Sequence, residues 1–193
     1  MTRPDVLVFV DTETTGLDPV EHELLEVAVI KEVDGVVTDR WVRKIKPTHL
    51  ENAEPKALEA NGYSPEKWAD AVPFETVAQE LADLIGRGTM VGHNVNFDAG
   101  FIGNSLKRAG VKANLNHHAV DTLTLAREHL RPCGIGSLRL DNIREFLGWS
   151  LDGAHTALVD AEDARRLYYL LLRASVFSRM WWQLRARVRG VSR

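Results

Sequence analysis

The chain has 193 residues, a formal net charge of −3 and 45% hydrophobic residues. This composition is ordinary for a soluble globular protein, and the length favours one domain with a sizeable core. The single cysteine, Cys133, excludes an internal disulfide, no apolar run reaches membrane-spanning length, and no hydrophobic signal segment opens the sequence. These features predict a cytoplasmic protein without a membrane partner.

The charge is unevenly distributed along the chain. Residues 1–164 carry 16 Lys and Arg and all 27 Asp and Glu, a net charge of −11, whereas residues 165–193 carry eight arginines and no acid, a net charge of +8. A basic end on an acidic body suits a polyanionic partner, and it equally suits docking of that end onto the body.

The first predicted element is a strand over residues 6–10, five apolar residues that indicate burial on both faces. Asp11 and Glu13 follow where the apolar run stops, and side chains two apart on a strand share one face. At about 5 Å and an effective dielectric of about 20 the two carboxylates would repel by roughly 3 kcal/mol, which favours a compensating cation. A hard divalent ion with oxygen ligands is the natural choice. The alternative is that Asp11 caps a turn and Glu13 is solvated. Residues 14–16 then turn the chain, and their backbone amides would be able to face an anionic substrate.

Two further strands, over residues 24–30 and 37–45, are separated by an Asp-Gly turn signal and predict an antiparallel meander with the first strand. Residues 48–73 are expected to be irregular or to form short helices, because prolines and an Asn-Gly pair interrupt them. The apolar spacing over residues 74–85 predicts a helix, and residues 89–93 read as a short strand.

The second half of the chain predicts further α/β units. Asn94 is expected to cap a helix that carries Asp98 in its first turn, and Thr156 to cap the last long helix, in which Asp160 lies near the start. A short strand at residues 119–120 and helices over 123–130 and 138–147 lie between them. This order predicts an α/β fold in which helices flank a mixed sheet.

Four carboxylates and one imidazole therefore lie at strand ends or near helix starts, where one site could collect them. His155 lies five residues before Asp160, in the loop that precedes the last long helix, where it would be free to swing over the other groups. Such a set suits a phosphodiesterase in which two divalent ions roughly 3.5–4 Å apart activate a water, and a histidine takes the proton of that water. Each residue also has a simpler interpretation, because the helix dipole favours acids such as Asp98 and Asp160 near helix starts.

Three motifs carry a family resemblance. Residues 11–17, Asp-Thr-Glu-Thr-Thr-Gly-Leu, resemble the first exonuclease motif of the DEDD superfamily, and residues 92–98, Gly-His-Asn-Val-Asn-Phe-Asp, resemble the second. Residues 155–161, His-Thr-Ala-Leu-Val-Asp-Ala, are similar to the third motif in its histidine-bearing form. The chain thus resembles the DEDDh, or DnaQ-like, 3′–5′ exonucleases, which are typified by the proofreading epsilon subunit of bacterial DNA polymerase III.

The resemblance implies a ribonuclease H-like fold with a mixed five-stranded sheet flanked by helices. It implies an exonuclease domain over residues 1–173 and a basic extension over residues 174–193 that is not a separate domain. The extension contains Trp181 and Trp182 among its arginines, so it would either track a single strand or pack onto the body or a second copy.

The same resemblance implies a role for each motif residue. Asp11, Glu13 and Asp160 would ligate the metal beside the nucleophile, and Asp11 would also touch the second ion. Asp98 would act on the metals directly or through water, and His155 would be the general base. The ions would be Mg²⁺ or Mn²⁺.

Residues that would bind the substrate are Thr14, Thr15, Leu17, Asn61 and Asn94. The family pattern has a His-Gly pair where this chain has Asn61-Gly62, and Lys56 stands where epsilon subunits often carry an acid. These departures leave the metal chemistry untouched and concern the grip on the end nucleotide, and hence the preference for one sugar.

The resemblance predicts hydrolysis of single-stranded DNA from the 3′ end to nucleoside 5′-monophosphates, in DNA replication or repair. An RNA-trimming relative, similar to oligoribonuclease or RNase T, is the alternative enzyme, and a non-catalytic nucleic-acid-binding module is the alternative class. The predicted partners are the 3′ ends of single-stranded DNA or RNA, with a polymerase or a second copy of the chain as further candidates.

Overall fold

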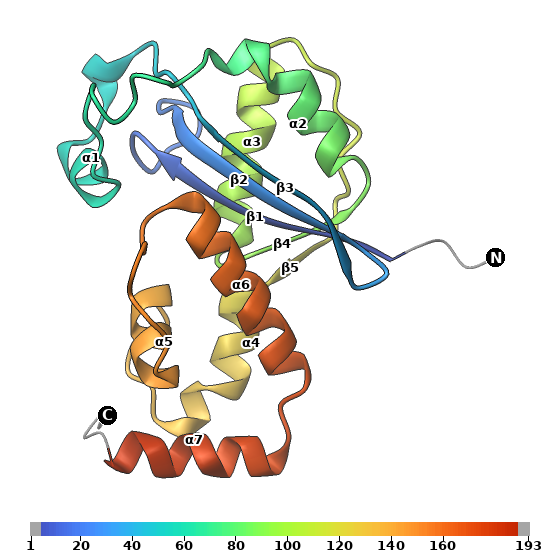
Figure 1. Ribbon diagram of the computed structural model, residues 1–193, viewed down its shortest axis with the longest axis vertical. Coiled ribbons are helices and arrows are strands. Elements are labelled where there is room, and N and C mark those ends of the chain that lie inside the picture. Colours follow the sequence, from blue (N-terminus) through green and yellow to red (C-terminus); the bar gives the residue numbers. More distant parts are fainter. Residues whose placement is uncertain (1–4, 189–193) are drawn as a thin grey trace.

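The computed structural model describes residues 5–188, so the first four residues of the predicted domain and the last five of its basic extension lie outside the described residues. A five-stranded sheet with the order β3-β2-β1-β4-β5 forms the centre (Figure 1). Its strands are β1 (Val6–Thr14), β2 (Leu24–Val33), β3 (Val36–Lys44), β4 (Thr89–Gly92) and β5 (Ala119–Asp121). The first three strands form an antiparallel meander, and β4 and β5 add in parallel to β1. The predicted mixed sheet is therefore confirmed, with β1 as its central strand.

The two faces of the sheet are covered by different helices. Val8 and Val10 of β1 pack with side chains of α2 (Ala78–Ile85) and α3 (Val95–Arg108). Phe9 of β1 packs with Ala157 and Ala161 of α6 (Ala157–Leu172), whose small side chains allow close approach of the helix to the sheet. Figure 1 shows α2 and α3 on the side of the sheet away from α6. Because side chains alternate along a strand, Asp11 and Glu13 continue the series of Phe9 and face α6.

A second cluster of apolar side chains joins the helices in the lower part of Figure 1. These helices are α4 (Thr122–His129), α5 (Leu140–Leu147), α6 and α7 (Val176–Val188), with the 3₁₀ turn η3 (Arg131–Cys133) between α4 and α5. In α7, Trp182 is buried in this cluster, whereas the neighbouring Trp181 is exposed. One of the two tryptophans in the basic extension therefore packs onto the body.

The segment between β3 and β4 departs in detail from the prediction. Residues 48–73 contain the 3₁₀ turn η1 (Leu50–Asn52) and the short helix α1 (Pro55–Ala60). The helix predicted over residues 74–85 begins as a separate 3₁₀ turn, η2 (Phe74–Thr76), before α2 starts at Ala78. Among the described residues, no helix has the length and apolar character needed to cross a membrane.

Candidate active site

Carboxylates of strand β1 and helix α6 meet at one end of β1. Asp11 and Glu13 of β1 and Asp160 of α6 each offer an oxygen, and these oxygens all lie within 4.8 Å of one another. The first two residues share a face because they are two apart on a strand, and the packing of α6 on that face brings the third residue to them. Among the described residues this is a group of acids close enough to share one cation.

Asp98 lies beside this group of three and is held from a different direction. It sits in the first turn of α3 and is buried, and its Oδ1 accepts a hydrogen bond of 2.8 Å from the Thr12 hydroxyl on β1. Thr12 points to the face of β1 opposite to that of Asp11, so the bond ties α3 to the strand end. Asp98 is thus outside the group of three acids whose oxygens lie within 4.8 Å of one another, although its charge raises the pKa of both Asp11 and Glu13.

The four acids are difficult to ionise together. Burial raises the pKa of Asp11 well above its usual value, and the charge of Asp98 adds the largest further increase. Burial and the charge of Asp160 raise the pKa of Glu13 to about 8. Burial raises the pKa of Asp98 to about 7, although the hydrogen bond from Thr12 opposes the change. Such mutual repulsion at a partly buried site is the condition that a bound divalent cation relieves.

Arg144 of α5 forms an ion pair with Asp160. Its side chain is 1% exposed, and its Nη2 donates a hydrogen bond of 2.6 Å to Oδ1 of Asp160. Its Nε and Nη1 donate to Asp163 at 2.7 Å and to Asp141 at 2.8 Å. Burial alone would lower the pKa of this guanidinium, but its hydrogen bonds to the carboxylates, that of Asp163 first, raise it above the ordinary value. Arg144 is therefore a fixed positive charge that orients one oxygen of Asp160.

Glu26 of β2 anchors the start of α6. Its carboxylate accepts a buried hydrogen bond of 2.8 Å from the backbone N–H of Ala157, the first residue of that helix. Thr156 occupies the N-cap position, but its side chain makes no capping hydrogen bond, so the prediction that it caps the helix is wrong. A carboxylate from the neighbouring strand supplies the acceptor instead.

Asn94 also departs from the prediction of a side-chain cap. It occupies the N-cap position of α3 in the left-handed conformation, with φ of 73°, and its side chain makes no capping hydrogen bond. Its backbone N–H donates instead to Oδ1 of Asp121 at 2.8 Å, the same oxygen that caps α4 through Leu123. The Asn94 side chain is exposed, as a contact to substrate would require.

His155 lies in the loop before α6, as predicted. It has φ of 64°, and its side chain is 51% exposed. Its Nε2 lies 3.2 Å from Oδ2 of Asp141 on α5. Asp160, which follows in α6, also lines the hollow of about 580 Å³ that His155 and Asp141 border. The histidine therefore lines the same hollow as Asp160, one of the three acids of the cluster.

The predicted substrate-binding loop after β1 is firmly held. Thr15 is buried, its N–H donates to the carbonyl of Glu23 at 2.8 Å, and its hydroxyl accepts from the N–H of Glu23. The amide of Thr15 is thus engaged within the protein, which contradicts the expectation that it faces an anion. Thr14 is buried with its hydroxyl on the carbonyl of Gly16, whereas Leu17 is 72% exposed.

Asn61 touches the same loop from α1. Its side-chain amide donates to the carbonyl of Thr14 at 2.9 Å, so this contact connects the end of α1 to the end of β1. Asn61 is only partly buried, and it lies beside the loop that bears Leu17. The structure therefore places the residue that replaces the family's histidine next to the predicted nucleotide site.

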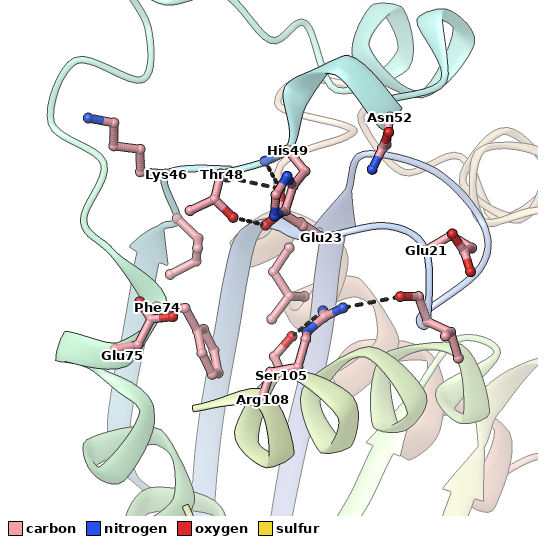
Figure 2. Close-up of a pocket in the computed structure, with 13 residues that line it drawn as sticks. Glu21, Glu23, Lys46, Thr48, His49, Asn52, Phe74, Glu75, Ser105 and Arg108 are labelled. Carbon is pink, nitrogen blue, oxygen red and sulfur yellow. Dashed lines mark hydrogen bonds between the residues drawn. The ribbon is translucent and has the colours of Figure 1, made fainter. Parts of the chain in front are cut away.

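A pocket of about 350 Å³ lies on the opposite, α3 side of the sheet (Figure 2). Glu23 accepts hydrogen bonds there from the backbone N–H groups of Thr48 and His49, at 2.9 and 2.7 Å. Arg108 of α3 donates to the carbonyl of His22 at 3.2 Å. These hydrogen bonds hold the segment after β1 on the α3 side of the sheet. The acids of the cluster do not line this pocket.

Three residues that support the site, namely Asp141, Arg144 and Glu26, are absent from the predicted set. A signal existed for Glu26, because an acid inside the apolar run of β2 is rare without a buried partner. Asp141 and Arg144 form an ion pair three residues apart on α5, which a sequence displays equally on any solvated helix.

The fold and the acidic cluster define a class of protein, the ribonuclease H-like nucleases. The family model described as Exonuclease matches residues 8–168, and the chain belongs to this exonuclease family, which confirms the resemblance to DnaQ-like 3′–5′ exonucleases. Members typically use divalent metal ions, and the cluster is suited to hold one.

Two bacterial relatives are polymerases of much greater length. The PolC-type DNA polymerase III of Bacillus cereus is 31% identical over 169 residues, which cover 88% of this chain and 11% of the relative. That of Thermotoga petrophila is 30% identical over 161 residues, 83% of this chain and again 11% of the relative. The chain thus spans about one ninth of the length of these proteins.

Solved structures of E. coli exonuclease I share the fold. Its complex with a dT13 oligonucleotide has a TM-score of 0.73 at 22% identity and covers 92% of this chain and 42% of that one. Its complex with a dA16 oligonucleotide has a TM-score of 0.75 at 21% identity, over 92% and 42% of the two chains. These structures confirm the predicted ribonuclease H-like architecture.

Proposed function

We propose that this protein hydrolyses single-stranded DNA from its 3′ end and releases nucleoside 5′-monophosphates. The convergence of Asp11, Glu13 and Asp160 within 4.8 Å of one another supports this function above all. A structural role for such a cluster is unfavourable, because the charges raise one another's pKa at a partly buried site.

The donor set fits two divalent cations, Mg²⁺ or Mn²⁺. Carboxylate oxygens are the ligands that both ions prefer, and the group contains no sulfur or imidazole that would favour a softer metal. Asp11, Glu13 and Asp160 would hold one ion, and Asp11 and Asp98 the second. When bound, such ions supply positive charge that activates water and stabilises the leaving oxygen.

The chain's own residues then have separate tasks. His155 takes a proton from the attacking water while the oxygen of that water bonds to phosphorus. The bond from phosphorus to the 3′ oxygen breaks, and the 3′ oxygen takes a proton from solvent to become the 3′ hydroxyl of the shortened strand. Arg144 keeps the carboxylate of Asp160 in one orientation throughout. Leu17, Asn61 and the exposed Asn94 border the place of the terminal nucleotide.

Further assignments rest on the comparisons and the sequence. We propose an exonuclease domain over residues 1–173 with residues 174–193 as its extension, acting in the cytoplasm in DNA replication or repair. Similarity to a segment of PolC-type polymerases favours a polymerase as partner. Oligonucleotides of deoxythymidine and deoxyadenosine in the exonuclease I complexes favour single-stranded DNA over RNA.

The test is product analysis on matched DNA and RNA oligonucleotides, each labelled at the 5′ end, with Mg²⁺, Mn²⁺ or EDTA. We expect stepwise shortening of the DNA from the 3′ end, release of nucleoside 5′-monophosphates and no reaction in EDTA. Faster shortening of the RNA would replace the proposed substrate with RNA. Binding without any mononucleotide release, unaffected by EDTA, would favour a non-catalytic module.

Asp11→Ala is the diagnostic variant for this function. It should abolish cleavage and leave the fold intact, because it removes one member of a repulsive group. The matched control, Asp152→Ala, changes an exposed acid of the loop before α6 and should cleave at the normal rate. Loss of folding in Asp11→Ala would assign the acids a structural role.

A further inference from the structure

A chain of contacts connects the exposed histidine to the buried arginine. Oδ2 of Asp141 lies 3.2 Å from Nε2 of His155, and Oδ1 of the same carboxylate accepts the 2.8 Å hydrogen bond from Nη1 of Arg144. The two oxygens of Asp141 thus serve two partners, one on its own helix and one in the loop before α6.

The inner end of this series of contacts, at Arg144, is rigid. The side chain of Arg144 is 1% exposed, and its other nitrogens are hydrogen-bonded to Asp160 and Asp163 on α6. An arginine with three carboxylate partners in fixed geometry has little freedom to move. Arg144 therefore fixes the carboxylate of Asp141 relative to that of Asp160, because it donates to both.

The outer end of this series of contacts is exposed by comparison. Half of the His155 side chain is exposed, and the residue follows a loop that starts after Gly148. Its imidazole contacts the carboxylate of Asp141. A general base must be oriented toward the proton that it takes, and for an imidazole the group facing one ring nitrogen decides which nitrogen carries the proton.

We propose that Asp141 is a positioning residue for His155. Its carboxylate keeps the proton on Nε2 and restrains the ring in the hollow that Asp160 also lines, which leaves Nδ1 to take the proton from the attacking water. This inference rests on the proposed function, because it needs His155 to be the general base. It adds a member to the site that none of the three motifs contains.

Replacing Asp141 with asparagine changes the charge of the side chain but not its shape. Asp141→Asn retains an oxygen that can accept from Arg144, and it replaces the carboxylate charge that faces His155 with an amide. The matched control is Asp152→Asn, which makes the same chemical change at an exposed residue of the loop that carries His155.

The experiment is a double-mutant cycle on cleavage of a 5′-labelled single-stranded DNA oligonucleotide with Mn²⁺. Asp141→Asn should lower kcat roughly 10–100-fold, the range for loss of a group that orients a site residue, and leave KM within about twofold. In the His155→Ala background the same substitution should have no further effect, because it acts through the imidazole. Asp152→Asn should be silent in both backgrounds.

Two outcomes would overturn the proposal. An equal loss in the His155→Ala background would mean that Asp141 acts through Arg144 and Asp160. A faster Asp141→Asn enzyme would mean that the carboxylate restrains the histidine in an unproductive position.

Nitrogen-15 NMR of the histidine rings in the metal-free protein separates this inference from the proposed function. The His155 signals, identified by their loss in His155→Ala, should show a proton on Nε2 in the natural protein and a mixture of tautomers in Asp141→Asn. Unchanged tautomers would refute the positioning role, even if cleavage occurs as proposed. The expected tautomers without any mononucleotide release would refute the proposed function alone.

Discussion

Replacing Glu13 with glutamine tests whether the carboxylate cluster is electrostatically strained without metal. In the folded protein the pKa of Glu13 is raised from 4.5 to about 8. A group whose pKa is raised by folding stabilises the fold below its unfolded value, and this contribution is lost as the pH rises through the folded value. The free energy of unfolding in EDTA should therefore fall between pH 4.5 and 8 in the natural protein, and Glu13→Gln should reduce this fall.

The magnitude follows from the same pKa change. A rise from 4.5 to about 8 corresponds to roughly 5 kcal/mol at about 1.4 kcal/mol per pH unit. The carboxylate is only partly buried, so water screens its charge and neighbouring acids take up protons in its place. We expect Glu13→Gln to be more stable than the natural protein by about 2–3 kcal/mol at pH 9 in EDTA. For a chain of this size the midpoint of thermal unfolding would rise by roughly 5–10 °C.

Thermal and urea unfolding, each in EDTA and in Mn²⁺, would measure this difference. At pH 4 the two proteins should unfold alike, because Glu13 is then protonated. Mn²⁺ should stabilise the natural protein more than the variant at pH 9, since binding to the folded state alone adds to its stability. Glu128→Gln, on the exposed side of α4, should match the natural protein throughout. A difference between natural protein and Glu13→Gln that is the same at pH 4 and pH 9, or a less stable variant at pH 9, would refute the reasoning.

Three other substitutions test separate parts of the structure. His155→Ala should lower kcat by roughly 10²–10⁴-fold while DNA binding persists, as measured by single-turnover cleavage and fluorescence anisotropy; an unchanged rate would place the base elsewhere. Trp182→Ala should lower the free energy of unfolding by about 3–5 kcal/mol, because its ring is buried among the helices, whereas the exposed Trp181→Ala should have a much smaller effect in the same urea titration. Equal effects of the two would contradict the packing of α7. Asn61→Ala removes the hydrogen bond to the Thr14 carbonyl and should lower the free energy of unfolding by about 1 kcal/mol. Because that bond holds the predicted nucleotide-binding segment, KM for DNA should rise with kcat retained; a loss confined to kcat would exclude a role in binding.

Local pattern accounts for the parts of the site that lie within one element. The apolar run before Asp11 predicts a buried strand, and the two-residue period of a strand places Glu13 on the same face. Spacing near a helix start likewise predicts the first-turn positions of Asp98 and Asp160, which the structure shows. These predictions hold because they depend on backbone geometry that neighbouring residues determine.

Capping was predicted less well, because the acceptor came from a distant strand. Thr156 has the residue type and position of a helix cap, yet Glu26 accepts the first helical N–H across 131 positions of sequence. The Thr15 amide similarly turned out to be engaged by Glu23, through the fold of the loop after β1. Local propensity cannot weigh such competitors.

The sequence by itself determined the sheet-and-helix architecture and the family, and it supplied the candidate site residues, because strand alternation, helix period and the three motifs are each local. Only the tertiary structure decided how those residues are supported. The packing of α5 against α6 brings Arg144 to Asp160 and Asp141 to His155, and the packing of α6 on the sheet brings Glu26 to Ala157. Such pairs form where two buried surfaces fit together, and the sequence of either segment alone contains no record of that fit.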